Sequence, residues 1–116
     1  MTEQEISNAL DELISLVAEG KPLDAYEKFY HQDIQKIDLD GVLQTGKEKL
    51  LQNGTEAISI ITAVRDFSAV GKIVKGNRSF LVWSIDLDNT QGTLNVVEVA
   101  IQDWKDGKII SERYFA

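Results

Sequence analysis

The sequence predicts an α+β domain in which three helices precede a sheet of long antiparallel strands. Apolar residues recur at three- and four-residue steps in the N-terminal segments, as on one face of a helix. From residue 65 onward, β-branched and aromatic residues dominate, and short turns such as Asp106-Gly107 separate the segments. Helices followed by a run of antiparallel strands are typical of a domain whose helices cover one face of a sheet.

Two helices are expected to open the chain. Thr2 and Glu5 have the spacing of a capping box, in which a hydroxyl and a carboxylate each bind a free backbone amide. The apolar face behind this box consists of Ile6, Leu10, Leu13, Ile14 and Val17. Gly20 suits the left-handed residue after a helix, and Pro22 suits the first turn of the next one. The inner face of that second helix is predicted to be Ala25, Tyr26 and Phe29.

The middle of the chain predicts a short strand and a third helix. Alternation over residues 34–39, followed by the turn signal Gly41, predicts the strand. Thr45 and Glu48 repeat the capping-box spacing and predict that the helix begins there. Gly54 is expected to bend or interrupt this helix. The segment AISIITAV, residues 57–64, fits either the end of the helix or the start of a strand.

Four long strands are expected after this point. They cover residues 65–75, 79–88, 93–104 and 108–115. The turns between them lie at Gly76-Asn77, at residues 88–92 and at Asp106-Gly107.

The composition restricts the function classes. The chain of 116 residues predicts a single domain over residues 1–116. A net charge of −7 repels nucleic-acid phosphates and anionic membranes, so we expect neither partner. No apolar run approaches the roughly 20 residues that span a bilayer, and MTEQEISNAL is unlike a signal peptide. With no cysteine, these features predict a cytoplasmic protein. No spacing of ligands indicates a metal site, and no motif indicates a cofactor.

Three segments resemble the nuclear transport factor 2-like superfamily, and within it the SnoaL-like bacterial subgroup. They are LVAEGKPLDAYEKFYHQDI at residues 16–34, Gly46-Lys47-Glu48, and VEVAIQDWKDGKIISERYF at residues 97–115. The resemblance implies a cone-shaped, cystatin-like fold, in which helices close a pocket formed by a strongly bent, mostly antiparallel sheet. It also implies a homodimer. Members of this superfamily include isomerases, cyclases, hydrolases and plain binding modules, so the fold alone does not give the function.

The strand around Glu98 has two possible orientations. One face carries Glu98, Ala100, Gln102 and Trp104, and the other carries Val97, Val99 and Ile101. Apolarity alone would place the valine face in the core and Glu98 in solvent. The resemblance implies the opposite, with Glu98 facing the pocket and the Val97, Val99 and Ile101 face meeting a second subunit.

The resemblance also turns Glu112 and Tyr114 inward. Two carboxylates in an apolar pocket raise the pKa of at least one of them, which suits a general acid. The alternative is that Glu98 or Glu112 only accepts hydrogen bonds, from Tyr26, Tyr30 or Trp83. Asp38 matches the position of the base in the steroid isomerases of the superfamily. The oxyanion donors of those enzymes, however, correspond here to Leu13 and Ala100, which cannot donate.

Three functions stay open from the sequence. The first is binding of an uncharged or weakly cationic apolar molecule. The second is a lyase- or isomerase-like enzyme in which Glu98 and Glu112 share the acid and base roles and Asp38 or Tyr114 assists. The third is a dimerisation module with a filled core. The expected ligand contacts are Leu13, Tyr26, Trp83, Ala100, Gln102 and Tyr114.

Overall fold

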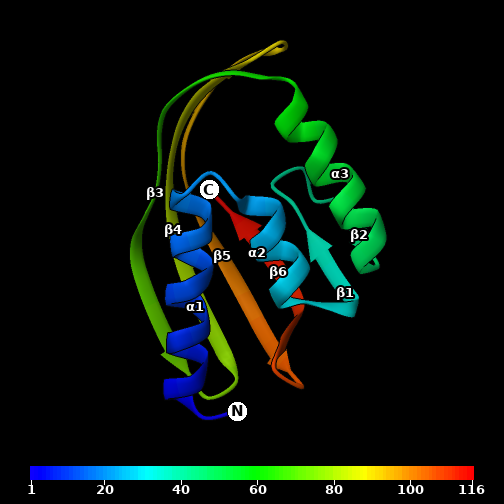
Figure 1. Cartoon of the computed structure of the whole chain (residues 1–116), viewed down its shortest axis with the longest axis vertical. Helices are drawn as coiled ribbons and strands as arrows, with labels where there is room; N and C mark the ends of the chain where they lie inside the picture. The colour runs from blue at the N-terminus through cyan, green and yellow to red at the C-terminus, as the bar shows by residue number, and fades with distance from the viewer.

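The computed structural model describes all 116 residues and confirms the predicted α+β fold (Figure 1). The elements are α1 (Glu3–Ala18), α2 (Pro22–Phe29), β1 (Tyr30–Ile37), β2 (Leu43–Thr45), α3 (Lys47–Ser59), β3 (Ile61–Lys75), β4 (Arg78–Asn89), β5 (Gly92–Lys105) and β6 (Lys108–Phe115). The strands form one sheet in the order β2-β1-β6-β5-β4-β3. All neighbouring strands are antiparallel except β1 and β6, which run parallel.

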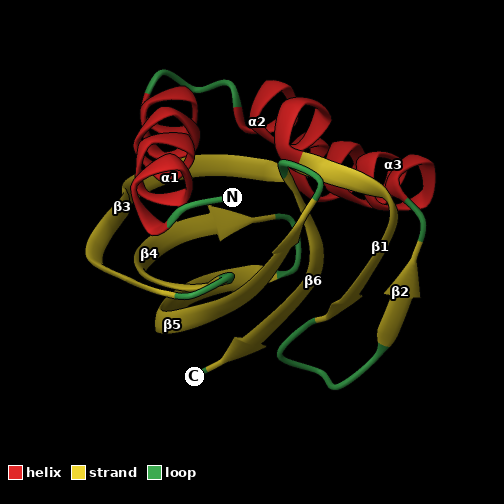
Figure 2. Cartoon of the chain, turned by 90° about the horizontal axis from the view of Figure 1, so that it is seen from below, coloured by secondary structure: helices red, strands yellow, loops and turns green.

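The sheet is strongly bent, and the three helices lie along its concave side (Figure 2). The pairing of β3 with β4 shifts register in three places, between Ile61 and Ala63, between Val64 and Asp66, and between Ala69 and Gly71. Each such bulge adds an unpaired residue to one strand and increases its local bend and twist. A further irregularity lies between β1 and β6. The bend therefore has a local cause in both outer parts of the sheet.

The ends of α1 agree with the sequence prediction. Thr2 Oγ1 accepts a hydrogen bond from the backbone amide of Glu5 at 3.1 Å, and Glu5 Oε1 accepts from the amide of Thr2 at 2.9 Å. Gly20 has a φ of 79°, in the left-handed region that glycine tolerates. Pro22 begins α2. The capping box and the two punctuation residues thus fix how α1 and α2 meet.

The start and the interior of α3 differ from the prediction. Gly46 is its N-cap and makes no side-chain capping bond, while Thr45 ends β2. Gly54 does not interrupt the helix, which continues to Ser59. A Cβ atom at position 54 would lie 3.3 Å from Leu23 Cδ2, so this glycine allows α3 to pack closely on α2.

Several strand boundaries also differ from the prediction. β1 begins at Tyr30 rather than at residue 34, and the three-residue β2 was not predicted. β3 begins at Ile61, so AISIITAV contains both the end of a helix and the start of a strand. Pairing with neighbouring strands, which is nonlocal, sets these limits.

The core lies between α1, α2 and the concave face of the sheet. Its fully buried members come from both layers and include Ile6, Leu10, Ile34, Leu81 and Ile109. The inner face of α2 is as predicted for Ala25 and Phe29, which are buried. None of the three helices combines the length and apolarity needed to cross a lipid bilayer.

We predict that Thr2→Val lowers the free energy of unfolding by about 1 kcal/mol, because it removes the capping hydroxyl of α1. Thr45→Val is the matched control, since Thr45 has the same spacing to a glutamate but caps no helix. Chemical denaturation of both variants measures the difference. An equal loss in the two variants would show that the Thr2 hydroxyl has no capping effect.

Candidate functional site

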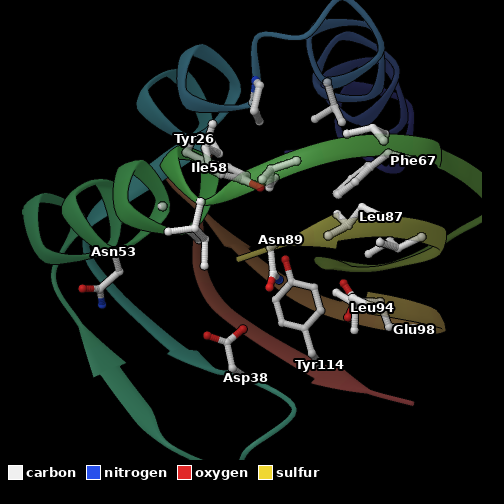
Figure 3. Close-up of a pocket in the computed structure, with 18 of the residues that line it drawn as sticks. Tyr26, Asp38, Asn53, Ile58, Phe67, Leu87, Asn89, Leu94, Glu98 and Tyr114 are labelled. Carbon is white, nitrogen blue, oxygen red and sulfur yellow. The ribbon is translucent and has the colours of Figure 1, made fainter. Parts of the chain in front are cut away.

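The concave face of the sheet and the three helices enclose an open pocket of about 1090 Å³ (Figure 3). Side chains from every helix and strand of the chain reach its wall, and most of them are apolar. The apolar part includes Ile58 from α3, Phe67 from β3 and Leu87 from β4. Below it, a small inner cavity of about 40 Å³ lies between the pocket and the core. The residues that border both cavities are Val17, Tyr26, Phe67, Glu98 and Tyr114.

Glu98 lies on the concave face of β5 and borders the pocket. Its backbone pairs with Trp83 of β4, whose side chain is buried on the same face. The carboxylate is half-buried and makes no hydrogen bond or ion pair within the chain. Burial raises the pKa of Glu98; the Lys36 ammonium opposes this shift, and the carboxylates of Asp38 and Glu112 add to it. Glu98 is therefore an unpaired acid at the inner end of the pocket.

Glu112 has a different environment, although it is on the neighbouring strand. It is 3% exposed, and it accepts hydrogen bonds from Tyr30 Oη at 2.5 Å and from Gln102 Nε2 at 2.8 Å. The network continues through Ser79 Oγ, which donates to Gln102 Oε1 and accepts from Trp104 Nε1. The sequence left open whether Glu112 is a general acid or only accepts hydrogen bonds. In the structure it accepts a hydrogen bond from a tyrosine, Tyr30. It borders the inner cavity but not the main pocket.

Tyr26 and Tyr114 supply two hydroxyl groups near these carboxylates. Burial and the negative charge of Glu112 raise the pKa of both side chains. Both hydroxyls therefore stay protonated at neutral pH and can donate a hydrogen bond. The ring of Tyr26 stacks on that of Tyr30, with a centroid distance of 5.0 Å, which fixes its position. Figure 3 shows Tyr114 between Asp38 and Glu98 at the pocket wall.

Asp38 follows the end of β1 and also borders the pocket. It accepts a hydrogen bond from Gln44 Nε2 at 2.9 Å, and its carboxylate lies 3.8 Å from Lys36 Nζ. Lys36 was not among the predicted site residues. The strand pattern could have indicated it, because Lys36 is two residues from Ile34 and so lies on the same face of the strand as this fully buried residue.

The remaining predicted contacts lie deeper. Leu13, Trp83 and Gln102 border only the inner cavity, and Ala100 is fully buried and borders neither cavity. Sequence reasoning thus found the inner wall and missed the outer one. The outer wall includes Asn53, Ile58, Phe67, Leu87 and Leu94. Each of these reaches the pocket because of the bend of the sheet or the position of α3, which the sequence pattern does not give.

Comparison with known proteins gives a family match and several similar structures. The sequence matches the SnoaL-like domain over residues 1–116. A search among proteins with curated annotation finds no match. A proposed SnoaL-like polyketide cyclase from Mesorhizobium loti has a similar structure, with a TM-score of 0.84, 26% sequence identity and coverage of 100% of both chains.

Two more distant structures share the fold alone. An NTF2-like protein of unknown function from Burkholderia pseudomallei has a TM-score of 0.77 at 12% identity, and the match covers 99% of this chain and 91% of that one. A hypothetical protein from Catenulispora acidiphila, with a ketosteroid isomerase-like fold, was solved in complex with trimethylamine. Its TM-score is 0.75 at 13% identity, with coverage of 93% and 84%.

We predict that Glu98→Gln increases stability at neutral pH but not in acid. Because folding raises the pKa of Glu98, the ionised carboxylate is disfavoured in the folded state. The penalty is absent below the ordinary value of 4.5 and grows as the pH rises through the folded pKa. Urea unfolding between about pH 4 and pH 8 should therefore show an advantage of the variant that increases with pH.

Glu56→Gln is the control for this measurement, because Glu56 is exposed and forms no ion pair. Its stability difference from the wild type should change less with pH. An advantage of Glu98→Gln that shrinks with rising pH would mean that the Glu98 carboxylate stabilises the fold when it is charged.

Proposed function

Because the chain belongs to the SnoaL-like domain family, we propose that it binds a small, largely apolar molecule in the pocket between its helices and the bent sheet. The observation that carries this proposal is the open cavity of about 1090 Å³ beside an otherwise packed core. Ligand pockets are typically apolar concavities of about 300–1,000 Å³ with a few convergent polar groups. Here the polar groups of the wall include Glu98 and Tyr114, which also border the inner cavity, and Asp38.

The charges of the pocket wall favour an uncharged or weakly cationic ligand over an anion. Asp38 and Glu98 contribute two carboxylates to the wall, whereas the carboxylate of Asp66 is bound by Ser68 and Ser84. Arg65 also reaches the wall, but its guanidinium is bound to Asp86 and Asp88 at distances of 2.8 to 3.0 Å. The other basic residue of the wall, Lys36, has its ammonium 3.8 Å from the Asp38 carboxylate, so an anionic ligand would compete with Asp38 for it and would lie close to two negative charges. The trimethylamine complex of the Catenulispora acidiphila protein supports the idea that this fold can hold a small organic molecule.

We predict that neutral apolar compounds raise the melting temperature of the protein, whereas carboxylates of the same size do not. Thermal shift and native mass spectrometry measure this with matched alcohols, ketones and acids. Ala57→Trp should weaken binding at least about tenfold, because Ala57 is an exposed residue of the pocket wall and the indole would fill the entrance. Glu56→Trp is the control on the same helix, outside the wall. Equal binding by both variants would place the ligand elsewhere.

A second candidate function is acid–base catalysis of the lyase or isomerase type. The observation that favours it is Glu98, a pocket carboxylate with a raised pKa and no partner in the chain. Glu112 is a weaker candidate for a proton-transfer step, since Tyr30 and Gln102 already bind its two oxygens. In this candidate function Glu98 transfers a proton to or from a bound molecule, and Tyr114 or Asp38 assists it. Glu98→Gln would then abolish turnover while ligand affinity is retained.

The convex face of the sheet supports a homodimer. Cross-strand pairing places Ile73, Phe80 and Ile101 in one row. Val82, Val99 and Phe115 form the next row, and Val97 follows on β5. Ile73, Val97 and Phe115 are at least half exposed. An apolar patch that crosses four strands is a typical interaction surface, and a second copy of the chain would bury it.

We predict that Val99→Asp converts the protein to monomers, because it places a charge in the middle of this patch. Sedimentation velocity at several concentrations measures the change. Val42→Asp is the control, since Val42 is an exposed valine outside the patch. A dimer that persists in Val99→Asp would exclude the convex face as the interface.

A further inference from the structure

Lys36 is the basic residue of the pocket wall whose charged group makes no hydrogen bond to the protein. The other one, Arg65, is bound to Asp86 and Asp88. The Lys36 side chain is only 17% exposed, and its ammonium lies 3.8 Å from Asp38 Oδ1, beyond hydrogen-bond distance. Three N–H donors of a largely buried cation are therefore free at the pocket wall.

Two aromatic rings and a carboxylate surround this ammonium. Lys36 Nζ lies 5.0 Å from the centre of the Tyr114 ring and 5.9 Å from that of the Tyr26 ring. The faces of aromatic rings attract cations at such distances, and Asp38 adds its negative charge. This combination of groups is the one that recognises alkylammonium ligands, but here a side chain of the protein fills it.

The backbone keeps Lys36 in this position. In the sheet, Lys36 is paired with Gln44 of β2 on one side and with Glu112 of β6 on the other. A residue paired on both sides cannot turn to the opposite face without breaking the register of β1. Gln44 also holds Asp38 through its side-chain amide. The ammonium is thus presented to the pocket by the sheet itself.

Building on the proposed function, we propose that Lys36 determines the specificity of the pocket. Its ammonium fills the cation site formed by Tyr26, Tyr114 and Asp38 and points its free donors at the ligand. This narrows the proposed ligands from uncharged or weakly cationic molecules to uncharged apolar ones that carry a carbonyl or ether oxygen, and it excludes amines of the same shape. A second cation at this position would meet the charge of Lys36 at close range, whereas an acceptor oxygen would satisfy one of its N–H groups.

The test compares two probes of similar shape, cyclohexanone and cyclohexylammonium, by NMR titration of the full chain. Wild type should bind the ketone at least about tenfold more tightly than the amine. Lys36→Met keeps an unbranched side chain up to the position of Cε and removes only the ammonium group. It should reverse this order, because the amine can then take the place of the ammonium. Lys105→Met, at an exposed lysine outside the pocket, should leave the order unchanged.

The outcomes separate this inference from the proposed function. Binding of the probes without a reversal in Lys36→Met would overturn the assignment of Lys36 and leave the binding pocket intact. No binding of either probe to wild type or to the variant would overturn both proposals.

A second measurement does not depend on a ligand of the wild type. In Lys36→Ala, n-propylammonium should raise the melting temperature by replacing the missing part of the side chain, and it should have no such effect on wild type. n-Propanol has the same number of non-hydrogen atoms and no charge. Equal rescue by n-propanol would show that the site recognises the shape of the chain and not its charge.

Discussion

The bend of the sheet is the constraint on which the other features of this molecule depend. Bulges in β3 and an irregularity between β1 and β6 curve the sheet around one side. The helices can then fill the narrow part of the concavity with apolar side chains such as Ile6 and Leu10. They do not fill the wide part, because α3 packs on α2, β1 and β2, and the pocket lies between α3 and β4. The pocket is therefore a consequence of curvature and not of any single residue.

The same bend explains why two glutamates on neighbouring strands have opposite environments. Glu112 lies in the narrow part, where Tyr30, from a segment 82 residues away in sequence, can reach it. A buried carboxylate with two donors is a satisfied element of the core. Glu98 lies at the start of the wide part, where no donor reaches it, and its pKa rises through burial. The position of each glutamate in the concavity of the sheet therefore decides whether its carboxylate is bound within the core or is available to a ligand.

Local features were predictable from the sequence, and nonlocal ones were not. The capping box of Thr2 forms because both of its partners lie within one helical turn. The same spacing at Thr45 fails because strand pairing of Thr45 with Gln35 takes precedence over capping. The orientation of Glu98 required the family resemblance, since the alternating pattern of β5 fits either face. Lys36 escaped prediction because its surroundings depend on the parallel pairing of β1 with β6, two strands that lie far apart in the sequence.

Strand β5 connects the two surfaces that the proposals use. Glu98 faces the pocket, while its sequence neighbours Val97 and Val99 belong to the apolar patch on the convex face. A partner subunit on that patch would hold the backbone of β5 and therefore the direction of the Glu98 side chain. Lys36 contributes a positive charge to the pocket wall. Its strand, β1, is paired with β6, and β6 is paired with β5. Three neighbouring strands of the sheet, β1, β6 and β5, thus connect Lys36 to Glu98. A change in the packing of β5 against a second subunit would affect the position of Glu98 first.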